Sequence, residues 1–504
     1  MPLADPSRTP VATTEHPPLK LLFGALLLVM LLAALDQTIV STALPTIVSE
    51  LGGVAQLPWV VTAYLLASTV VVPLYGKFGD LYGRKLVLQI AIGLFLLGSM
   101  LCSMAQGMTS LILLRAVQGL GGGGLMVVTL AAIGDVIPPA ERGRYQGLFG
   151  GVYGLATVVG PLIGGFLVEH FSWRWIFYIN LPLGVLALVV IGIVFHPHGQ
   201  RVRHAIDYAG ATLLTLALAS LVLFTSEGGN HLPWSSPLLW GLLVLMVVSV
   251  TGFLIAEKHA AEPIIPLALF RHRSFALCSL IGFVVGISLF GSVTFLPLYM
   301  QVVKNATPTA AGMQMLPLMG TLLLVSTISG RTISAWGRYR IFPIVGTLLQ
   351  AIGMALLSQV KVDTPTWLID ICMAIVGAGL GMVMQVLTLA VQNSVDPRHM
   401  GVATSGVTLF RSIGGSLGVS LFGAVFAWGL QHRLAAMAGM SGEPIGDLAP
   451  ARIHALPAAQ QHAWQHAFAG SMHTVFLCAC VITLIAFALT WLLEEAPLRG
   501  KTTH

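Results

Sequence analysis

Long apolar segments alternate with short polar ones along almost the whole chain. Fourteen segments approach the ~20 residues that a helix needs to cross the hydrocarbon core of a bilayer. They are 20–44, 57–76, 85–105, 109–136, 143–168, 174–195, 206–226, 236–256, 274–301, 308–329, 341–360, 366–392, 402–431 and 467–493. Lipid offers no hydrogen-bond partners to an open backbone, so we expect an all-α integral membrane protein with fourteen transmembrane helices.

Composition points to the same class of protein. Only 9% of the 504 residues are charged and 56% are hydrophobic, whereas soluble domains carry about 25% charged residues. The net charge of +6 comes from bases scattered between the apolar segments, so nucleic acid is not an expected partner. The five cysteines lie in apolar segments and show neither metal-ligand spacing nor a disulfide framework.

The distribution of Lys and Arg predicts the orientation in the membrane. Five of the 25 bases fall in the loops of one side, and most of the others fall in the loops and tails of the opposite side. The base-rich side is the cytoplasmic one, and the number of segments is even. We therefore expect both termini in the cytoplasm, with 1–19 and 494–504 as tails.

A ten-residue stretch joins the second and third segments and reads Gly-Lys-Phe-Gly-Asp-Leu-Tyr-Gly-Arg-Lys. A link this short is a tight turn, whose glycines permit positive φ and close backbone approach. Asp80 can cap the next helix or pair with a base. The spacing resembles the loop between helices 2 and 3 of the major facilitator superfamily. The resemblance implies a gating motif of Gly76, Lys77, Asp80, Gly83, Arg84 and Lys85.

A weak internal repeat indicates two related halves. Gly330 to Tyr339 matches this stretch at Gly76, Lys77, Gly83 and Arg84, although Ser334 replaces Asp80. The two loops are eight segments apart rather than six, so two helices are inserted between the halves. The pattern resembles the fourteen-helix drug:proton antiporter (EmrB/QacA type) family. The resemblance implies a major facilitator fold with six-helix bundles 20–196 and 274–493, inserted helices 206–256, a cytoplasmic linker 257–273 and a long outer loop 432–466.

Two charged residues lie inside apolar segments of the first half. Asp36 is in the first segment and Arg115 in the fourth, and the helical rise puts them at similar depth. A charge inside a membrane costs several kcal/mol unless it is paired or hydrated, so both are functional candidates. The polar residues after Asp36 suit the wall of a hydrated cavity. We expect the pair to communicate directly or through water, with Asp36 taking up a proton and Arg115 favouring its release; two independent structural groups are the alternative.

The fifth segment is rich in glycine. Small residues let helices pack closely in lipid, and a proline can kink the helix. The run resembles the motif that marks exporters within the superfamily. The resemblance implies an antiporter motif of Gly154, Gly160, Pro161, Gly164 and Gly165.

Other polar, methionine and aromatic side chains in the segments are candidates for a substrate cavity, with packing against lipid or core as the alternative. They are Gln37, Tyr64, Tyr153, Phe290, Met313, Gln314, Gln385, Phe410 and Arg411. Asp370 is either a second proton site or a solvated helix end. His462 and His466 have a spacing that can bind zinc, but a polar helix face is the commoner reason for it, and no metal is expected.

Together these features predict a secondary active transporter rather than an enzyme, driven by a proton gradient without a cofactor. The resemblance implies a proton-coupled multidrug efflux antiporter of the bacterial cytoplasmic (inner) membrane. It would export hydrophobic compounds, cations among them, by alternating access. The alternative is an exporter of one defined metabolite, siderophore or lipid. The expected partners are small substrates, protons and the lipid bilayer; we expect a functional monomer, and a periplasmic adaptor stays open.

Overall fold

The computed structural model describes residues 19–51, 57–137, 139–195, 207–228, 232–261, 263–293, 295–306, 308–435 and 457–496. Most of the predicted tails 1–19 and 494–504 and most of the predicted outer loop lie outside these residues. In the described ranges the chain is helical, with a single isolated bridge between Gly228 and Leu232. The expectation of an all-α protein is confirmed.

The first half contains the helices that precede the insertion. They are α1 (Leu19–Leu51), α2 (Leu57–Tyr82), α3 (Arg84–Ser103), α4 (Met108–Val136), α5 (Pro139–His170), α6 (Trp175–Tyr178) and α7 (Asn180–Val194). The inserted pair is α8 (Tyr208–Glu227) and α9 (Pro237–His259), followed by the short helix η2 (Leu267–Arg271). The second half consists of α10 (Arg273–Val293), α11 (Leu296–Val303), α12 (Pro308–Met313), α13 (Leu316–Trp336), α14 (Ile341–Ser358), α15 (Thr366–Ser394), η3 (Pro397–His399), α16 (Met400–Ala435) and α18 (Ala458–Thr490).

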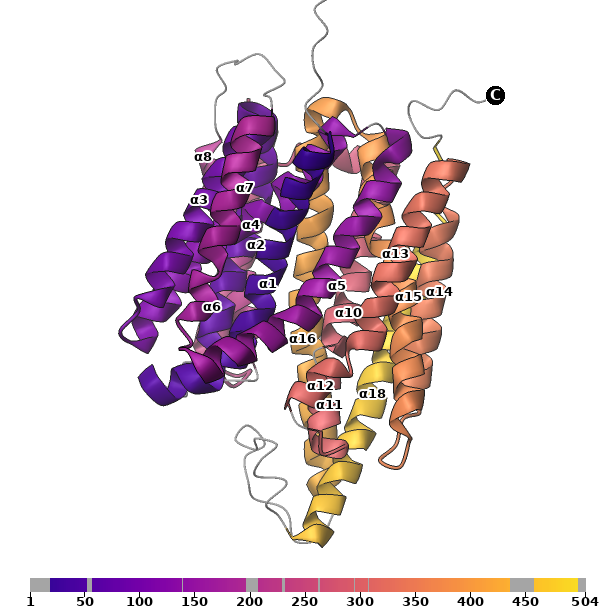
Figure 1. The fold of residues 1–504 in the computed structure, drawn as a ribbon. Coiled ribbons are helices and arrows are strands. Elements are labelled where there is room, and N and C mark those ends of the chain that lie inside the picture. Colours follow the sequence, from indigo (N-terminus) through magenta and orange to yellow (C-terminus); the bar gives the residue numbers. More distant parts are fainter. Residues whose placement is uncertain are drawn as a thin grey trace, which may run out of the picture.

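Twelve helices of the described ranges are long and apolar enough to cross a membrane, and α5 and α10 complete a set of fourteen long helices. Figure 1 shows the two halves side by side, with α1 beginning and α18 ending at the same end of the bundle. We call this end the termini side. On α9, Leu238, Trp240 and Val244 are each more than half exposed. An apolar surface of this extent is stable in lipid rather than in water, as expected for a multi-pass membrane protein.

Three predicted segments are interrupted rather than continuous. Segment 174–195 divides into α6 and α7, 274–301 into α10 and α11, and 308–329 into α12 and α13. Each break is short and leaves the apolar run intact, so hydropathy does not reveal it. Helices also extend into the predicted outer loop 432–466, since α16 ends at Ala435 and α18 begins at Ala458. Alanine and glutamine favour helix there.

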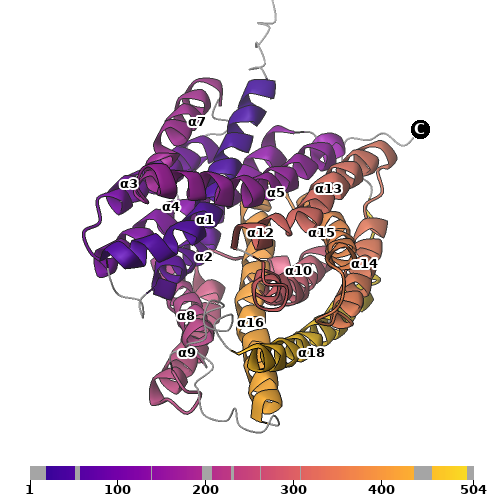
Figure 2. The same ribbon diagram turned by 60° about the horizontal axis from the view of Figure 1, so that its bottom comes forward.

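The inserted pair lies beside α2 and α16, one helix from each half, as Figure 2 shows. Val70 of α2, Leu214 of α8, Phe253 of α9 and Leu409 of α16 are buried in one apolar cluster. Burying such side chains stabilises the arrangement by about 1.5–3 kcal/mol each. The pair is therefore docked across the seam between the halves.

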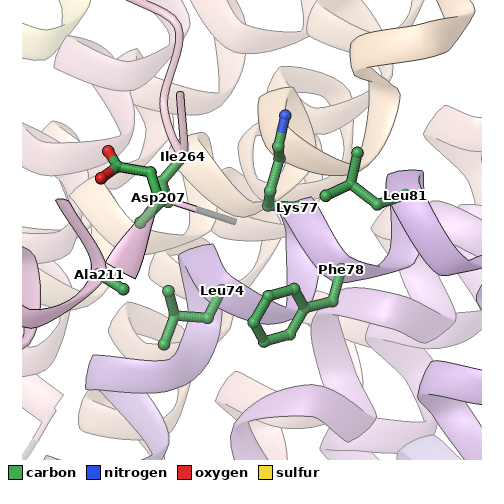
Figure 3. A pocket seen from close by; sticks show the side chains of 7 residues that line it. All are labelled: Leu74, Lys77, Phe78, Leu81, Asp207, Ala211 and Ile264. Carbon is green, nitrogen blue, oxygen red and sulfur yellow. The ribbon is translucent and has the colours of Figure 1, made fainter. Parts of the chain in front are cut away.

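The predicted linker is packed into this same cluster. Ile264 and Ile265 are buried there, and Glu257 Oε1 accepts their backbone N–H groups at 2.9 and 3.3 Å. Figure 3 shows a small pocket between α2, α8 and the linker, with Lys77 and Asp207 on its rim. This pocket lies outside the contact between the halves.

Candidate functional site

Asp36 and Arg115 form an ion pair in the interior of the first half. Arg115 Nη1 donates to Asp36 Oδ2 at 2.8 Å, and the two side chains are 2% and 0% exposed. The pair arises because α1 and α4 pack against each other and carry these residues at the same depth. The two residues that the sequence singles out in the first half therefore meet directly.

Two amides complete the surroundings of the carboxylate. Gln118 Nε2 donates to Asp36 Oδ1 at 2.8 Å, and Asn180 Nδ2 donates to the same oxygen at 3.0 Å. Gln118 Oε1 accepts from Arg115 Nη1 at 2.7 Å, and Arg115 Nε donates to Val60 O at 3.3 Å. Every group that contacts the carboxylate in these bonds is a donor, so the site is built for the ionised form of Asp36.

The expectation that Asp36 lines a hydrated cavity is wrong for this conformation. The Asp36 side chain has no exposed surface, and the ring of Tyr64 lies 4.3 Å from the Arg115 guanidinium. Tyr64 is itself buried, so it belongs to this cluster and not to an open cavity, whereas Gln37 is exposed. Pairing and amide hydrogen bonds offset the cost of burying the charge, which removes the need for water. Contact between water and the Asp36 carboxylate therefore requires a change in helix packing.

The predicted tight turn is confirmed only at Gly83, because α2 continues through the gating motif to Tyr82 and α3 already begins at Arg84. Gly83 has φ 89°, a conformation that favours glycine, and α3 begins at the next residue. Gly76 lies so close to α16 that a Cβ would stand 2.8 Å from Gly401 O and would overlap Ser405. Lys85 Nζ donates to Gly192 O of α7 at 2.7 Å. Gly76 thus lets α2 approach α16 of the second half.

Asp80 links the two halves at the termini side. It accepts backbone N–H groups of Gly401 at 3.0 Å and Val402 at 2.9 Å, at the N-terminus of α16, where a negative charge is favoured. Asp80 also pairs with Arg84, whose Nε donates to Asp135 Oδ2 at 2.8 Å. The carboxylate is thereby fixed in position by its own half while it binds the other.

A second contact between the halves lies in the same region. Gln392 Nε2 of α15 donates to Leu130 O of α4 at 3.3 Å and to Thr404 Oγ1 at 3.1 Å. On the opposite side, polar contacts fix loops within one half: Glu50 accepts from Arg174 at 2.5 Å and Trp173 at 2.7 Å. The hydrogen bond from Arg174 lowers the pKa of Glu50. The cross-half bonds described here are thus near the termini.

The antiporter motif packs α5 against α1. Thr38 Oγ1 donates to Ala156 O at 3.0 Å, and a Cβ at Gly160 would overlap the Thr38 side chain. Gly164 is buried and Gly165 is exposed with open space beside it. The side chains at Tyr153, Gly154, Pro161 and Phe290 lie outside the described residues.

The remaining cavity candidates are spread over several elements. Met313 is 53% exposed and Gln314 is half-buried at the interruption between α12 and α13. Phe410 packs on Phe270 of η2, with ring centroids 5.9 Å apart. Gln385 on α15 and Arg411 on α16 are half-buried, as is Asp370 near the start of α15. Among the described side chains, this conformation does not assemble them into one site.

The second half carries a neutral counterpart of the buried site. Ser288 of α10 takes the place of Asp36 when Leu296-Pro297 is aligned with Leu44-Pro45. Its hydroxyl is 2.5 Å from Thr483 Oγ1 of α18. Ser288 also donates to Ala479 O at 3.2 Å, and both hydroxyl residues are fully buried. An ionisable group at this position is therefore a feature of the first half.

Sequence reasoning did not identify four residues that complete the Asp36 site and the Asp80 contact: Ser99, Gln118, Asp135 and Asn180. Asn180 and Ser99 are polar residues in apolar segments, and Asp135 is an acid near a segment end. Such positions are a weak signal by themselves, because isolated polar residues in membrane helices often bond their own backbone. The role of each of these residues follows only from the side chain that it contacts on another helix.

Related proteins share both sequence and architecture. Residues 26–419 match the sequence profile of the Major Facilitator Superfamily. Multidrug transporter protein MdtP of Bacillus subtilis is 41% identical over 407 residues, covering 80% of this chain and 75% of that protein. Multidrug resistance protein 3 of Bacillus subtilis is 34% identical over 505 residues, covering 97% and 98%.

Solved structures share the fold at low sequence identity. The human organic anion transporter MFSD10 has a TM-score of 0.66 and 14% identity, covering 94% of this chain and 100% of that one. With fourteen long helices in two halves, a termini-side turn of the signature spacing and these relatives, the chain belongs to the Major Facilitator Superfamily of membrane transporters.

Proposed function

We propose that this transporter is a proton-coupled multidrug efflux antiporter of the fourteen-helix type, exporting hydrophobic compounds, cations among them. The observation that carries the proposal is the Asp36–Arg115 ion pair, which is fully buried in the first half. An ionisable group retained inside a membrane domain is costly, and proton relays use such groups. The names of the two bacterial relatives support multidrug substrates.

The pair offers a simple basis for coupling. Ionised Asp36 is stable here only while Arg115 and the two amides bind it. Protonation removes the negative charge, which weakens the contact between α1 and α4 and favours another packing of the first half. One elementary charge moving through 100 mV supplies about 2.3 kcal/mol, which sustains roughly several-tens-fold accumulation of substrate without ATP.

Alternating access then needs a contact that closes one side. The Asp80 bonds to Gly401 and Val402 have this role in the proposal, closing the termini side while the site faces the opposite side. We place the termini side in the cytoplasm of a bacterium, in the inner membrane. The transporter works as a monomer in this scheme.

The test is transport by the full chain in proteoliposomes with an imposed pH gradient. Ethidium serves as the cationic probe, beside one neutral and one anionic fluorescent dye. Asp36→Asn is expected to reduce gradient-driven transport to the level of empty liposomes, because it cannot exchange a proton. Asp370→Asn, at a half-buried acid of the second half, is expected to retain transport.

Full gradient-driven transport by Asp36→Asn would remove this carboxyl from the mechanism. Loss in Asp370→Asn alone would move the proton site to the second half. If none of the dyes is transported but one metabolite drives proton release from purified protein, the alternative of a single-substrate exporter replaces multidrug efflux.

A further inference from the structure

We propose that Asn180 is a positioning residue that responds to the charge of Asp36 and couples it to the contact between α3 and α6. The proposal rests on the proposed function in taking Asp36 as the proton site. It assigns a role to a neutral side chain that bonds the carboxylate without carrying a proton itself. The evidence is the direction of each hydrogen bond around Asp36.

The hydrogen bonds at Asp36 fit one protonation state. Arg115, Gln118 and Asn180 each donate to the carboxylate, at 2.8, 2.8 and 3.0 Å. A protonated carboxyl carries an O–H and therefore needs an acceptor. Gln118 Oε1 already accepts from Arg115 at 2.7 Å. An acceptor for the new O–H must come from elsewhere in the site.

Asn180 supplies that acceptor. Its side chain is fully buried, and its Oδ1 has no hydrogen-bond partner, while its Nδ2 bonds both Asp36 Oδ1 and Ser99 Oγ at 3.0 Å. A buried amide oxygen without a partner costs about as much free energy as a lost hydrogen bond. Rotating the amide by half a turn exchanges the two atoms. Oδ1 then accepts the O–H of protonated Asp36, while Nδ2 moves to the position that had no partner and gives up its bonds to Asp36 and Ser99.

The rotation changes what Ser99 binds. In the ionised state Ser99 accepts from Asn180 and donates to Phe177 O at 2.9 Å. After rotation Asn180 presents an oxygen to Ser99, so the hydroxyl donates to Asn180 and releases Phe177 O. That carbonyl lies at the interruption between α6 and α7, which begins after Tyr178. Uptake of a proton on α1 thereby loosens a bond between α3 and α6.

Few other groups near Asp36 can gain or lose a proton. Among the described residues, the titratable or charged groups facing the cluster are Arg115 of α4, Cys102 of α3 and Tyr64 of α2. Arginine, cysteine and tyrosine side chains titrate above the acidic-to-neutral range in which a carboxyl responds. A pH-dependent change in this cluster over that range therefore reports Asp36.

The experiment is an infrared pH titration of the full chain in lipid nanodiscs, which needs no substrate. The carboxyl band of Asp36 is identified by its absence in Asp36→Asn. Asn180→Ala removes a charge-assisted bond to the ionised carboxylate and a weaker neutral bond to the protonated carboxyl, so the midpoint of the band is expected to move up, by at most about one pH unit. Asn180→Asp keeps the size and adds a like charge, so its shift is expected to be larger in the same direction. Ser99→Ala removes a hydrogen bond that holds the Asn180 amide in place. It is expected to move the midpoint of the Asp36 band up by less than Asn180→Ala does.

Two matched controls separate positioning from general packing. Ser103→Ala removes a hydroxyl of α3 that bonds only within its own helix, to Met100 O at 2.6 Å. Thr483→Val breaks the equally buried hydroxyl contact of the second half. Both are expected to leave the midpoint unchanged. An unchanged midpoint and band position in Asn180→Asp, with folded protein confirmed by its melting curve, would overturn the proposal.

The result also distinguishes this proposal from the proposed function. If Asn180 variants shift the Asp36 band while Asp36→Asn still transports on a pH gradient, the hydrogen-bond switch stands and the proton-coupled mechanism fails. If Asp36→Asn abolishes transport while the band in Asn180→Asp stays in place, the mechanism stands and the switch fails.

Discussion

At the scale of single residues, the geometry of arginine explains why the buried pair can exist. One Nη1 serves both Asp36 and Gln118, Nε serves Val60 O, and the guanidinium lies against the Tyr64 ring. A lysine ammonium has no planar fork with which to make these contacts together. Removing one partner of a buried pair costs about 3–5 kcal/mol, because the other charge is left uncompensated.

This penalty leads to a double-variant prediction. Arg115→Gln is expected to destabilise the protein by about 3–5 kcal/mol at neutral pH, because it strands an ionised Asp36. Adding Asp36→Asn removes that charge and is expected to restore a large part of the loss. Apparent melting temperatures in one detergent measure both. Additive losses in the double variant would contradict a direct energetic link between the two residues.

At the scale of elements, the linker depends on a carboxylate at the end of α9. Glu257 is 5% exposed, and its Oε1 accepts the backbone N–H groups of Ile264 and Ile265. Those N–H groups are buried with their side chains in the cluster that joins α2, α8 and α16. The position of the linker that joins α9 to the second half thus depends on the Glu257 carboxylate.

A pair of substitutions tests the cap. Glu257→Ala leaves two buried N–H groups without an acceptor and is expected to cost about 1–3 kcal/mol for each. Glu257→Gln keeps an oxygen for the same bonds and is expected to be milder. Limited proteolysis of residues 260–266 measures the difference, with cleavage expected to be faster in Glu257→Ala. Equal protection in both variants would mean that burial of the two isoleucines holds the linker by itself.

The sequence was informative about elements where a long apolar run or a charge stood out. Fourteen runs predicted the fourteen long helices, and charges inside two runs predicted Asp36 and Arg115 as a pair. The interruptions at residues 179, 295 and 314 were invisible, since short breaks do not change hydropathy. Asn180 and Ser99 could not be found either, because a neutral polar residue gains its role only from the helix opposite it.

At the scale of the whole molecule, the cross-half bonds near the termini hold the two halves together on one side. Asp80 bonds the first turn of α16, and Gln392 bonds Leu130 of α4. On the opposite side, Glu50 binds Arg174 within the first half, and Lys304 Nζ donates to Val362 O within the second at 2.6 Å. Partial burial lowers the pKa of Lys304. The cross-half bonds of Asp80 and Gln392 break when the halves separate at the termini side. The bonds of Glu50 and Lys304 stay intact, because both partners move with the same half.

Asp80→Asn should therefore shift the whole molecule toward opening at the termini side while leaving membrane insertion intact. The amide loses the charge that favours the N-terminus of α16 and the pair with Arg84, which together contribute about 1–3 kcal/mol. Spin labels at Tyr82 and Trp336, exposed ends of α2 and α13, measure the distance between the halves. We expect a longer distance and slower turnover in Asp80→Asn. Asp396→Asn, an exposed acid that bonds Arg398 N at 2.9 Å within its own half, is expected to change neither. An unaltered distance distribution together with normal turnover in Asp80→Asn would show that Asp80 does not control closure.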